Sequence, residues 1–269
     1  MTDWPRLIAD DFAVPADLPA AVGELTGMLA AADPAVRDDL AYPILVNWIR
    51  RGVLDDRLPA LGEAMVSRLA HPEIQARTFA PLILAAVVDR DPGAAGVRGW
   101  FEPFAAWWVG EPEIRGWDDK LGWLHAVAHG ADLAGAFGSA AGLAAADVLA
   151  VIARRVVAPT GYQYAQMEED RVARAIVRIL GRPGLAGGDA VGWLTVVDEL
   201  FATGGPGSLP VPVANTLAVL RATYVMTDRA RTPHAPAVTD AIAARLHLVF
   251  PAYSRSRPPR AGSERADAG

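Results

Sequence analysis

Apolar residues recur at three- and four-residue spacing along most of this chain, which is the spacing of an amphipathic helix. Alternating apolar and polar runs are missing, and no Asn-Gly or Asp-Gly pair marks a β-hairpin. The sequence therefore predicts an all-α fold of about eleven helices. The expected helices span residues 17–32, 34–52, 56–70, 73–89, 94–109, 117–137, 143–157, 165–180, 187–203, 210–227 and 235–249.

Turns rich in glycine and proline separate the expected helices. Pro34 and Pro72 each stand near the first position of a helix, where no backbone hydrogen bond is lost. Helices joined by short turns, in paired units of about 40 residues, are typical of HEAT or armadillo repeats. The sequence thus predicts an irregular α-α superhelix in a single domain over residues 1–252, although a compact bundle would have the same periodicity. Residues 253–269 are polar and rich in Arg, Ser and Pro, which predicts a disordered tail.

Composition limits the cellular setting. The chain has no cysteine, so it can form neither disulfides nor thiolate metal sites, and it has no cysteine nucleophile. It contains no uninterrupted apolar run of about 18 residues, and its N-terminus lacks the basic and apolar regions of a signal peptide. We therefore expect a cytoplasmic protein that does not enter a membrane.

Charge and motifs narrow the choice of partner. The net charge is −6, and Lys120 is the only lysine. A protein that binds duplex nucleic acid needs clustered Lys and Arg to neutralise phosphates, so nucleic acid is not expected here. Neither of the glycine-rich nucleotide-binding fingerprints is present, and we expect no nucleotide cofactor. The preference for Arg, Ala, Gly and Pro indicates a GC-rich bacterial origin.

The segment WDDKLGWLHAVAHGADLAG, residues 117–135, is the main candidate site. On a helix over residues 117–137, His125, His129 and Asp132 would share one face within about 40°, together with Asp118 and Gly122. Two histidines at this spacing can bind one divalent metal ion, and Asp132 would add an oxygen ligand, but the glutamate of the zinc-protease motif is missing. A histidine–carboxylate relay for acid/base catalysis is the second interpretation, and a polar packing seam is the third.

Residues on either side extend the candidate site. The segment GEPEIRGW places Glu113, Arg115 and Trp117 directly before the histidines, where they would orient a bound anion or hold the loop. Arg77 stands at a helix start, and if it faces inward it needs a carboxylate partner among the acids at 111–119. The expected ligand-binding residues are Arg77, Glu113, Arg115, Trp117, Asp118 and Trp123.

A further acidic run follows about 40 residues after the histidines. Glu168, Glu169 and Asp170 lie one repeat further along, and in an array of paired helices such elements face the same groove. One of these acids would supply an additional ligand, a general base or the partner that orients a histidine.

The segment EPEIRGWDDKLGWLHAVAHGADLA resembles the signature of a bacterial family that is catalogued as a domain of unknown function. Members of that family carry acid-x-Arg-Gly-aromatic and then Gly-Trp-x-His-x3-His-x2-Asp. The resemblance covers residues 35–180 and departs at Leu121, where a polar or basic residue is expected; Lys120 next to it is the alternative. It implies an all-helical, HEAT-like fold and singles out Arg77, Glu113, Arg115, Gly116, Gly122, Trp123, His125, His129 and Asp132.

Three functional hypotheses follow; the third, nucleic-acid processing by analogy with HEAT-like DNA glycosylases, is disfavoured by the net charge of −6. In the first, the chain binds a small molecule in a pocket around His125, His129 and Asp132, and acts as an isomerase, lyase or hydrolase through acid/base or metal-assisted chemistry. In the second, it is a non-catalytic HEAT-like module that binds a ligand or a protein partner.

Overall fold

The computed structural model describes residues 2–205 and 207–251. Over this part of the chain the fold is a stack of helices with one two-stranded hairpin, so the prediction of an all-α fold of about eleven helices is confirmed. The helices are α1 Trp4–Ala9, α2 Leu18–Met28, α3 Pro34–Val36, α4 Tyr42–Arg50, α5 Leu58–Arg68, α6 Ile74–Arg90, α7 Val97–Gly110, α8 Ala126–Ser139, α9 Ala145–Val157, α10 Glu168–Leu180, α11 Gly187–Gly192, α12 Thr195–Ala202, α13 Val211–Ala230 and α14 Ala235–Val249.

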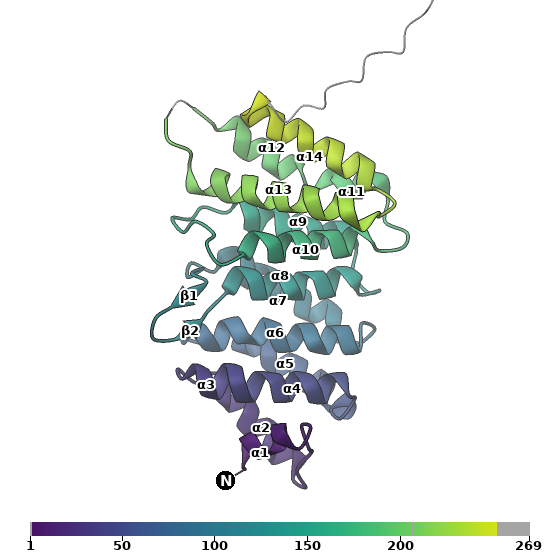
Figure 1. Ribbon diagram of the computed structural model, residues 1–269. Helices are drawn as coiled ribbons and strands as arrows, with labels where there is room; N and C mark the ends of the chain where they lie inside the picture. Colours follow the sequence, from purple (N-terminus) through teal and green to yellow (C-terminus); the bar gives the residue numbers. More distant parts are fainter. Residues whose placement is uncertain (1, 206, 252–269) are drawn as a thin grey trace, which may run out of the picture.

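The longer helices form two layers. Helices α4, α6, α8, α10 and α13 lie one above another in one layer, and α5, α7 and α9 lie behind them (Figure 1). A π-helical turn, Arg37–Ala41, joins α3 to α4, and a 3-10 turn, Asp55–Arg57, precedes α5. A single domain over residues 1–252 stays a prediction. The predicted disordered tail, residues 253–269, lies outside the described residues.

Helix starts follow the local chemistry of the sequence. The side chain of Asp33 accepts a hydrogen bond from the backbone N–H of Ala35 (2.9 Å), and Pro34 occupies the first position of α3 as predicted. The side chain of Asp17 caps α2 in the same way through the N–H of Ala20 (3.1 Å). Capping by a side-chain oxygen satisfies an N–H that has no partner inside the helix, which explains why these starts are readable from sequence.

Helix α8 is the most enclosed element of the stack. It packs between α6 and α10 in its own layer and against α7 and α9 behind. Small residues make this possible: a Cβ at Gly130 would overlap the Trp108 indole, and a Cβ at Gly138 would overlap the Ile179 side chain. The glycines therefore permit a close approach of α8 to its neighbours, despite their cost of about 1 kcal/mol each in a helix.

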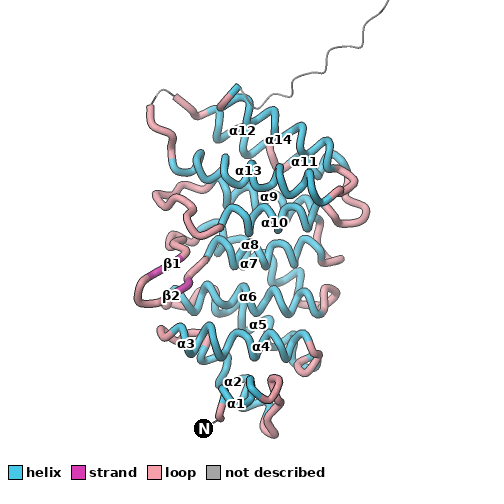
Figure 2. The backbone as a smooth tube through the Cα atoms, viewed as in Figure 1, coloured by secondary structure: helices cyan, strands magenta, loops and turns pink. Residues whose placement is uncertain are grey.

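The predicted helix over 117–137 is wrong in its first third. The chain instead forms β1 Trp117–Asp118 and β2 Gly122–Trp123, which pair antiparallel, and α8 begins at Ala126. Figure 2 shows this hairpin at the edge of the stack, outside the helical layers. The carboxylate of Asp118 accepts hydrogen bonds from the N–H groups of Lys120 (2.9 Å) and Leu121 (3.0 Å), a local turn that competes with helix formation. Gly122 then adopts φ +71°, which an L-residue rarely does.

Two other boundaries differ from the prediction. The expected helix 187–203 is broken into α11 and α12, because its first half contains three glycines that weaken the helix. The short helix α1 was not predicted; the side chain of Asp3 caps it through the N–H of Arg6.

We predict opposite effects of one substitution at two glycines. Gly130→Ala should lower the free energy of unfolding by about 1–3 kcal/mol, because the added methyl overlaps Trp108 in a closely packed core. Gly23→Ala in α2 should raise it by up to about 1 kcal/mol, because no atom lies within 4 Å of the new Cβ. Urea denaturation measures both, and equal effects at the two positions would contradict the close approach at α8.

Candidate functional site

The hairpin and the start of α8 bring several rings together. The rings of Trp123 and His125 stack in parallel, with centroids 4.5 Å apart and an interplanar angle of 7°. The centroids of the His125 and His129 rings lie 5.4 Å apart, and the rings of Phe79 and His129 meet edge to face with centroids 5.2 Å apart. These rings border a cleft of about 370 Å³. Its lining residues are Asp38, Tyr42, Phe79, Leu82, Trp123, His125, His129 and Arg171.

His125 reaches this cleft through an unusual backbone conformation. It stands at the N-cap of α8 with φ +47° and ψ +37°, in the left-handed region. A non-glycine residue there costs on the order of 1–3 kcal/mol and persists only where the surroundings enforce it. The helical-wheel argument therefore fails for His125, because this residue is not part of the helix that carries His129. The two imidazoles meet nevertheless, through the hairpin.

Both imidazoles are neutral at pH 7. His129 is buried, and its Nδ1 lies 2.9 Å from the carbonyl oxygen of Thr78, so Nδ1–H donates and Nε2 carries the lone pair. Burial holds the pKa of His129 well below its usual range. Burial, assisted by the positive charge of Arg171 and opposed by Asp132, lowers the pKa of His125 to about 4.

The Nδ1 atom of His125 is buried and finds no hydrogen-bond partner in residues 2–205 and 207–251. Its closest carboxylate oxygen is Oε1 of Glu168, at 4.0 Å. Buried polar atoms are nearly always hydrogen-bonded in native proteins, so an orphaned ring nitrogen at a cleft marks a position for a ligand atom or a water.

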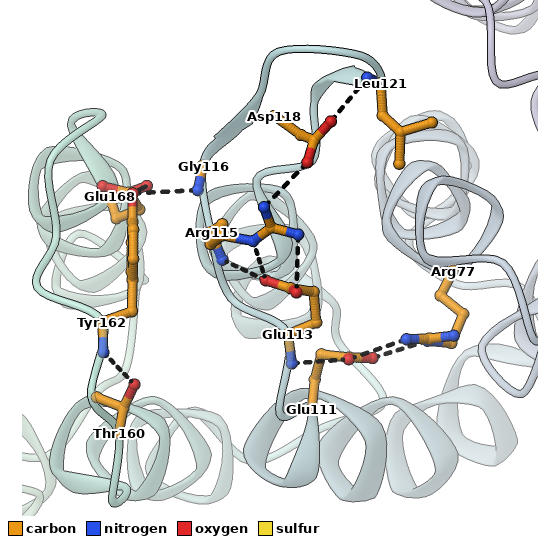
Figure 3. A network of polar contacts seen from close by, with 10 residues as sticks. All are labelled: Arg77, Glu111, Glu113, Arg115, Gly116, Asp118, Leu121, Thr160, Tyr162 and Glu168. Carbon is orange, nitrogen blue, oxygen red and sulfur yellow. Dashed lines mark hydrogen bonds and ion pairs between the residues drawn. The ribbon is translucent and has the colours of Figure 1, made fainter.

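Glu168 is the member of the acidic run that approaches the histidines. Its side chain is fully buried; Oε2 accepts hydrogen bonds from the N–H groups of Ala165 (3.0 Å) and Gln166 (2.7 Å), and Oε1 accepts one from the Tyr162 hydroxyl (3.4 Å). The same hydroxyl accepts a hydrogen bond from the N–H of Gly116 (3.1 Å) (Figure 3). A Cβ at Gly116 would overlap Oε1 of Glu168, so the glycine allows the backbone at residue 116 to lie close to the Glu168 carboxylate.

Asp132 is not directed at the histidines. Its carboxylate forms ion pairs with Arg171 and with Arg174, the latter at 2.5 Å. Within the described part of the chain, no group of three or more His, Asp or Glu side chains is placed to hold a metal ion. The predicted set of His125, His129 and Asp132 would bind a metal only after Asp132 released its two arginines.

The acid–arginine segment before the hairpin forms ion pairs that brace the loop. Arg77 and Glu111 form two hydrogen bonds, Nε to Oε2 (2.8 Å) and Nη2 to Oε1 (3.1 Å), and Trp107 Nε1 also donates to Oε2 of Glu111 (2.8 Å). Arg77 thus does have a carboxylate partner among residues 111–119. Arg115 binds both oxygens of Glu113 (2.9 and 3.0 Å) and one of Asp118 (2.9 Å) (Figure 3).

These contacts decide how the predicted ligand-binding residues are distributed. Of the six, Trp123 alone lines the cleft. Arg77 pairs with Glu111, and Arg115 pairs with both Glu113 and Asp118. Trp117 packs in a T-shaped arrangement with Trp123, with ring centroids 4.7 Å apart. The segment therefore positions the hairpin and does not itself border the cleft.

Sequence reasoning missed Arg37. Its guanidinium is fully buried and donates from Nη2 to the carbonyl oxygens of Leu121 (2.6 Å) and Trp123 (3.4 Å), which ties the hairpin to the π-helical turn. Nε donates to Asp38 (2.7 Å), and the guanidinium lies over the Phe79 ring at 4.6 Å. The only sequence signal is a charged residue on the inward face of an otherwise apolar pattern, which does not reveal a partner 84 residues away.

Comparisons with known proteins add a family. A family model described as "Protein of unknown function (DUF2785)" matches residues 65–225, which include the histidine segment. Neither the curated proteins nor the solved structures contain a match to this chain. The finer motif signature and the likeness to HEAT or armadillo repeats therefore stay predictions. None of the described helices combines the length and the apolar composition that a membrane span requires.

We predict that Arg37 anchors the hairpin. Arg37→Leu should lower the free energy of unfolding by about 3–5 kcal/mol, because it leaves Asp38 and the hairpin carbonyls without their buried partner. In hydrogen-exchange mass spectrometry, the amides of residues 117–124 should exchange faster than in the native protein. Arg98→Leu, at an exposed position of α7, is the control. Unchanged exchange in residues 117–124 would show that the hairpin is held by other contacts.

The depressed histidine pKa values predict a loss of stability in mild acid. The ordinary pKa of histidine is 6.5, and the pKa of His125 in the folded protein is about 4. Between these two pH values, His125 binds a proton in the unfolded chain but not in the folded one. The free energy of unfolding should therefore fall as the pH decreases through this window, and His125→Asn should make the decrease shallower. Urea denaturation at a series of pH values measures the slope. An NMR titration of the His125 ring with a midpoint near pH 6.5 would contradict the lowered pKa of His125.

Proposed function

This chain belongs to the DUF2785 family, and we propose that it binds a small molecule in the cleft beside Trp123, His125 and His129. The observation that carries the proposal is the state of His125: a buried, unpartnered Nδ1 on a residue in a strained backbone conformation. Strain and an unpaired polar atom both cost free energy, and they gather where a ligand compensates for them. Polar and aromatic side chains converge around the cleft as in other small-molecule sites.

The chemistry of the cleft suits hydrogen bonding to a ligand with some apolar surface. Neutral imidazoles at His125 and His129 can each donate one hydrogen bond and accept another, depending on the tautomer. His129 uses its Nδ1–H on Thr78 and keeps Nε2 as an acceptor. Trp123, with 41% of its surface exposed, supplies apolar contact at the mouth of the cleft.

A catalytic form of the proposal gives His125 the role of a general base. Its neutral ring would accept a proton from the ligand, and the carboxylate of Glu168, 4.0 Å away, would stabilise the imidazolium that forms. Base-catalysed isomerisation and elimination begin with such a proton transfer, whereas in hydrolysis the base would take the proton from the attacking water. Metal-assisted chemistry through His125, His129 and Asp132 would require Asp132 to leave Arg171 and Arg174 first.

The alternative is a non-catalytic interaction module, and the hairpin supports it. Trp117 and Trp123 pack against each other with 42% and 41% of their surfaces exposed. Exposed paired tryptophans are typical anchors of protein interfaces. In this case the hairpin would bind a protein partner, and the residues around the cleft would hold the hairpin in position.

We predict that substitutions in the cleft abolish retention of a ligand. The untagged protein is mixed with a bacterial metabolite extract, recovered by ultrafiltration, and the retained molecules are measured by mass spectrometry. His125→Asn and Trp123→Ala should each reduce retention at least tenfold, because one hydrogen bond to a buried group or one aromatic contact is worth about 1.4 kcal/mol or more. Asn tolerates the left-handed conformation, so His125→Asn should stay folded.

His247→Asn is the matched control. Its Nδ1 is also buried and has no hydrogen-bond partner among the described residues, but it belongs to α14, and it does not line the cleft. Native-like retention by a folded His125→Asn protein would disprove the binding proposal. A protein partner that is recovered by the native chain and lost with Trp117→Ala, with no small molecule retained, would favour the interaction module.

A further inference from the structure

A second hollow adjoins the cleft along the same layer of helices. It encloses about 410 Å³ and shares the side chains of Tyr42 and Leu82 with the cleft. Its walls come from α4, α6, α8 and α10. Six of its fourteen lining residues are charged, and none of these six lines the cleft. We call it the arginine groove after Arg50, Arg90, Arg174 and Arg178, which line it together with Asp89 and Asp132.

Positive charge exceeds negative charge at the groove. Arg90 and Arg178 are each matched by one aspartate, through the ion pairs Arg90–Asp55 and Arg178–Asp89 (both 2.6 Å). Arg174 has no aspartate of its own, because it shares Asp132 with Arg171. A net positive groove in a chain of net charge −6 is a local feature, since the remainder of the surface must be the more acidic.

Arg50 adds a further unmatched charge. It is the last residue of α4, it is exposed, and its side chain forms no hydrogen bond or ion pair with any described residue. A positive charge at a helix C-terminus complements the helix dipole, which accounts for its favourable position on α4. The dipole of α4 does not explain the positions of Arg171 and Arg174, which belong to α10 and whose charges also interact with the side chain of Tyr42.

The Tyr42 hydroxyl lies among these charges. Tyr42 lines both hollows, and its hydroxyl forms no hydrogen bond with the described residues. Burial raises the pKa of this phenol, and the charges of Arg50, Asp132, Arg171 and Arg174 all act on it. The hydroxyl is thus a protonated donor in a cationic setting, and a hydroxyl beside guanidiniums is a common arrangement for binding an oxyanion.

We propose that the arginine groove binds an anionic group, a phosphate or a carboxylate, through Arg50, Arg174 and the Tyr42 hydroxyl. As part of the proposed function, the same ligand extends into the cleft, so that its anionic end lies at Arg50 and its other end at His125. Arg174 contacts Asp132 through Nη2, which leaves its other donors for the anion. The groove fits a small molecule better than a duplex, because Asp89 and Asp132 interrupt the row of arginines and would repel a continuous phosphate backbone.

The test uses inorganic phosphate and succinate as probes on the full chain, at constant ionic strength, with the arginine Nε–H resonances followed by NMR. Saturable shifts of the Arg50 and Arg174 resonances are expected, and the stronger of the two probes identifies the anionic group. Arg50→Gln should weaken binding by about tenfold, the effect of losing one charge-assisted hydrogen bond. Arg154→Gln is the control, because Arg154 is exposed on α9, its side chain has no partner in the described part of the chain, and it lines a different hollow.

Three results would overturn the inference: shifts that do not saturate for either probe, equal affinity in the native protein and Arg50→Gln, or equal weakening by Arg154→Gln. Saturable binding of a DNA duplex that depends on Arg50, without binding of either probe, would overturn it in favour of nucleic acid.

The inference and the proposed function fail separately. If Arg50→Gln retains the metabolite that His125→Asn loses, the cleft binds a ligand but the anion site is wrong. If phosphate or succinate binds as expected and no metabolite is retained, the anion site stands and the small-molecule function of the cleft does not.

Discussion

The buried guanidinium of Arg37 is the contact on which the geometry of the candidate site depends. It donates to carbonyl oxygens on the hairpin, to Asp38 and to the carbonyl of Ala31, and it lies against Phe79. A charge without exposure to water is tolerated only when its donors are used, and here most of them are directed at backbone carbonyls. The hairpin is therefore held against the helical stack by an ion that cannot move without losing several hydrogen bonds at once. This constraint fixes the positions of Trp123 and His125.

Asp132 has a comparable role on the other side of the cleft. It lies on α8, and the two arginines that it binds belong to α10. One carboxylate thus orients Arg171, which borders the cleft, and Arg174, which borders the arginine groove. The two hollows share Tyr42 and Leu82, and one ion-pair cluster connects them. A ligand bound in one hollow would therefore change the electrostatic field in the other.

Much of the fold follows from local patterns. Most helices lie within a few residues of their predicted bounds, because the apolar spacing is strong and the breaks carry recognisable chemistry, such as the Asp33 cap before Pro34. The error at residues 117–125 has an equally local cause that the periodic pattern conceals. Leu121, Leu124 and Ala128 fit a helical face, yet the turn made by Asp118 and the positive φ at Gly122 interrupt the helix. Spacing alone cannot weigh a side-chain turn against helix propagation.

The candidate site was predictable in part. The expectation that one acid of the run 168–170 approaches the histidines agrees with the 4.0 Å between Glu168 and His125, and the expectation of a carboxylate partner for Arg77 agrees with its pairing to Glu111. The role of Asp132 as an arginine partner was not predictable, because Arg171 is 39 residues away and nothing local selects between it and the histidines.

By itself, the sequence determined that the chain is helical, where most helices begin and end, and which segment holds the unusual concentration of histidine, tryptophan and acid. These properties depend on periodicity and on contacts between residues a few positions apart. Only the tertiary structure decided that His125 leaves the helix, that Arg37 holds the hairpin, and that the arginines of α4 and α10 face one groove. Those arrangements depend on contacts across tens of residues, where burial and charge pairing select one partner among many that the sequence offers.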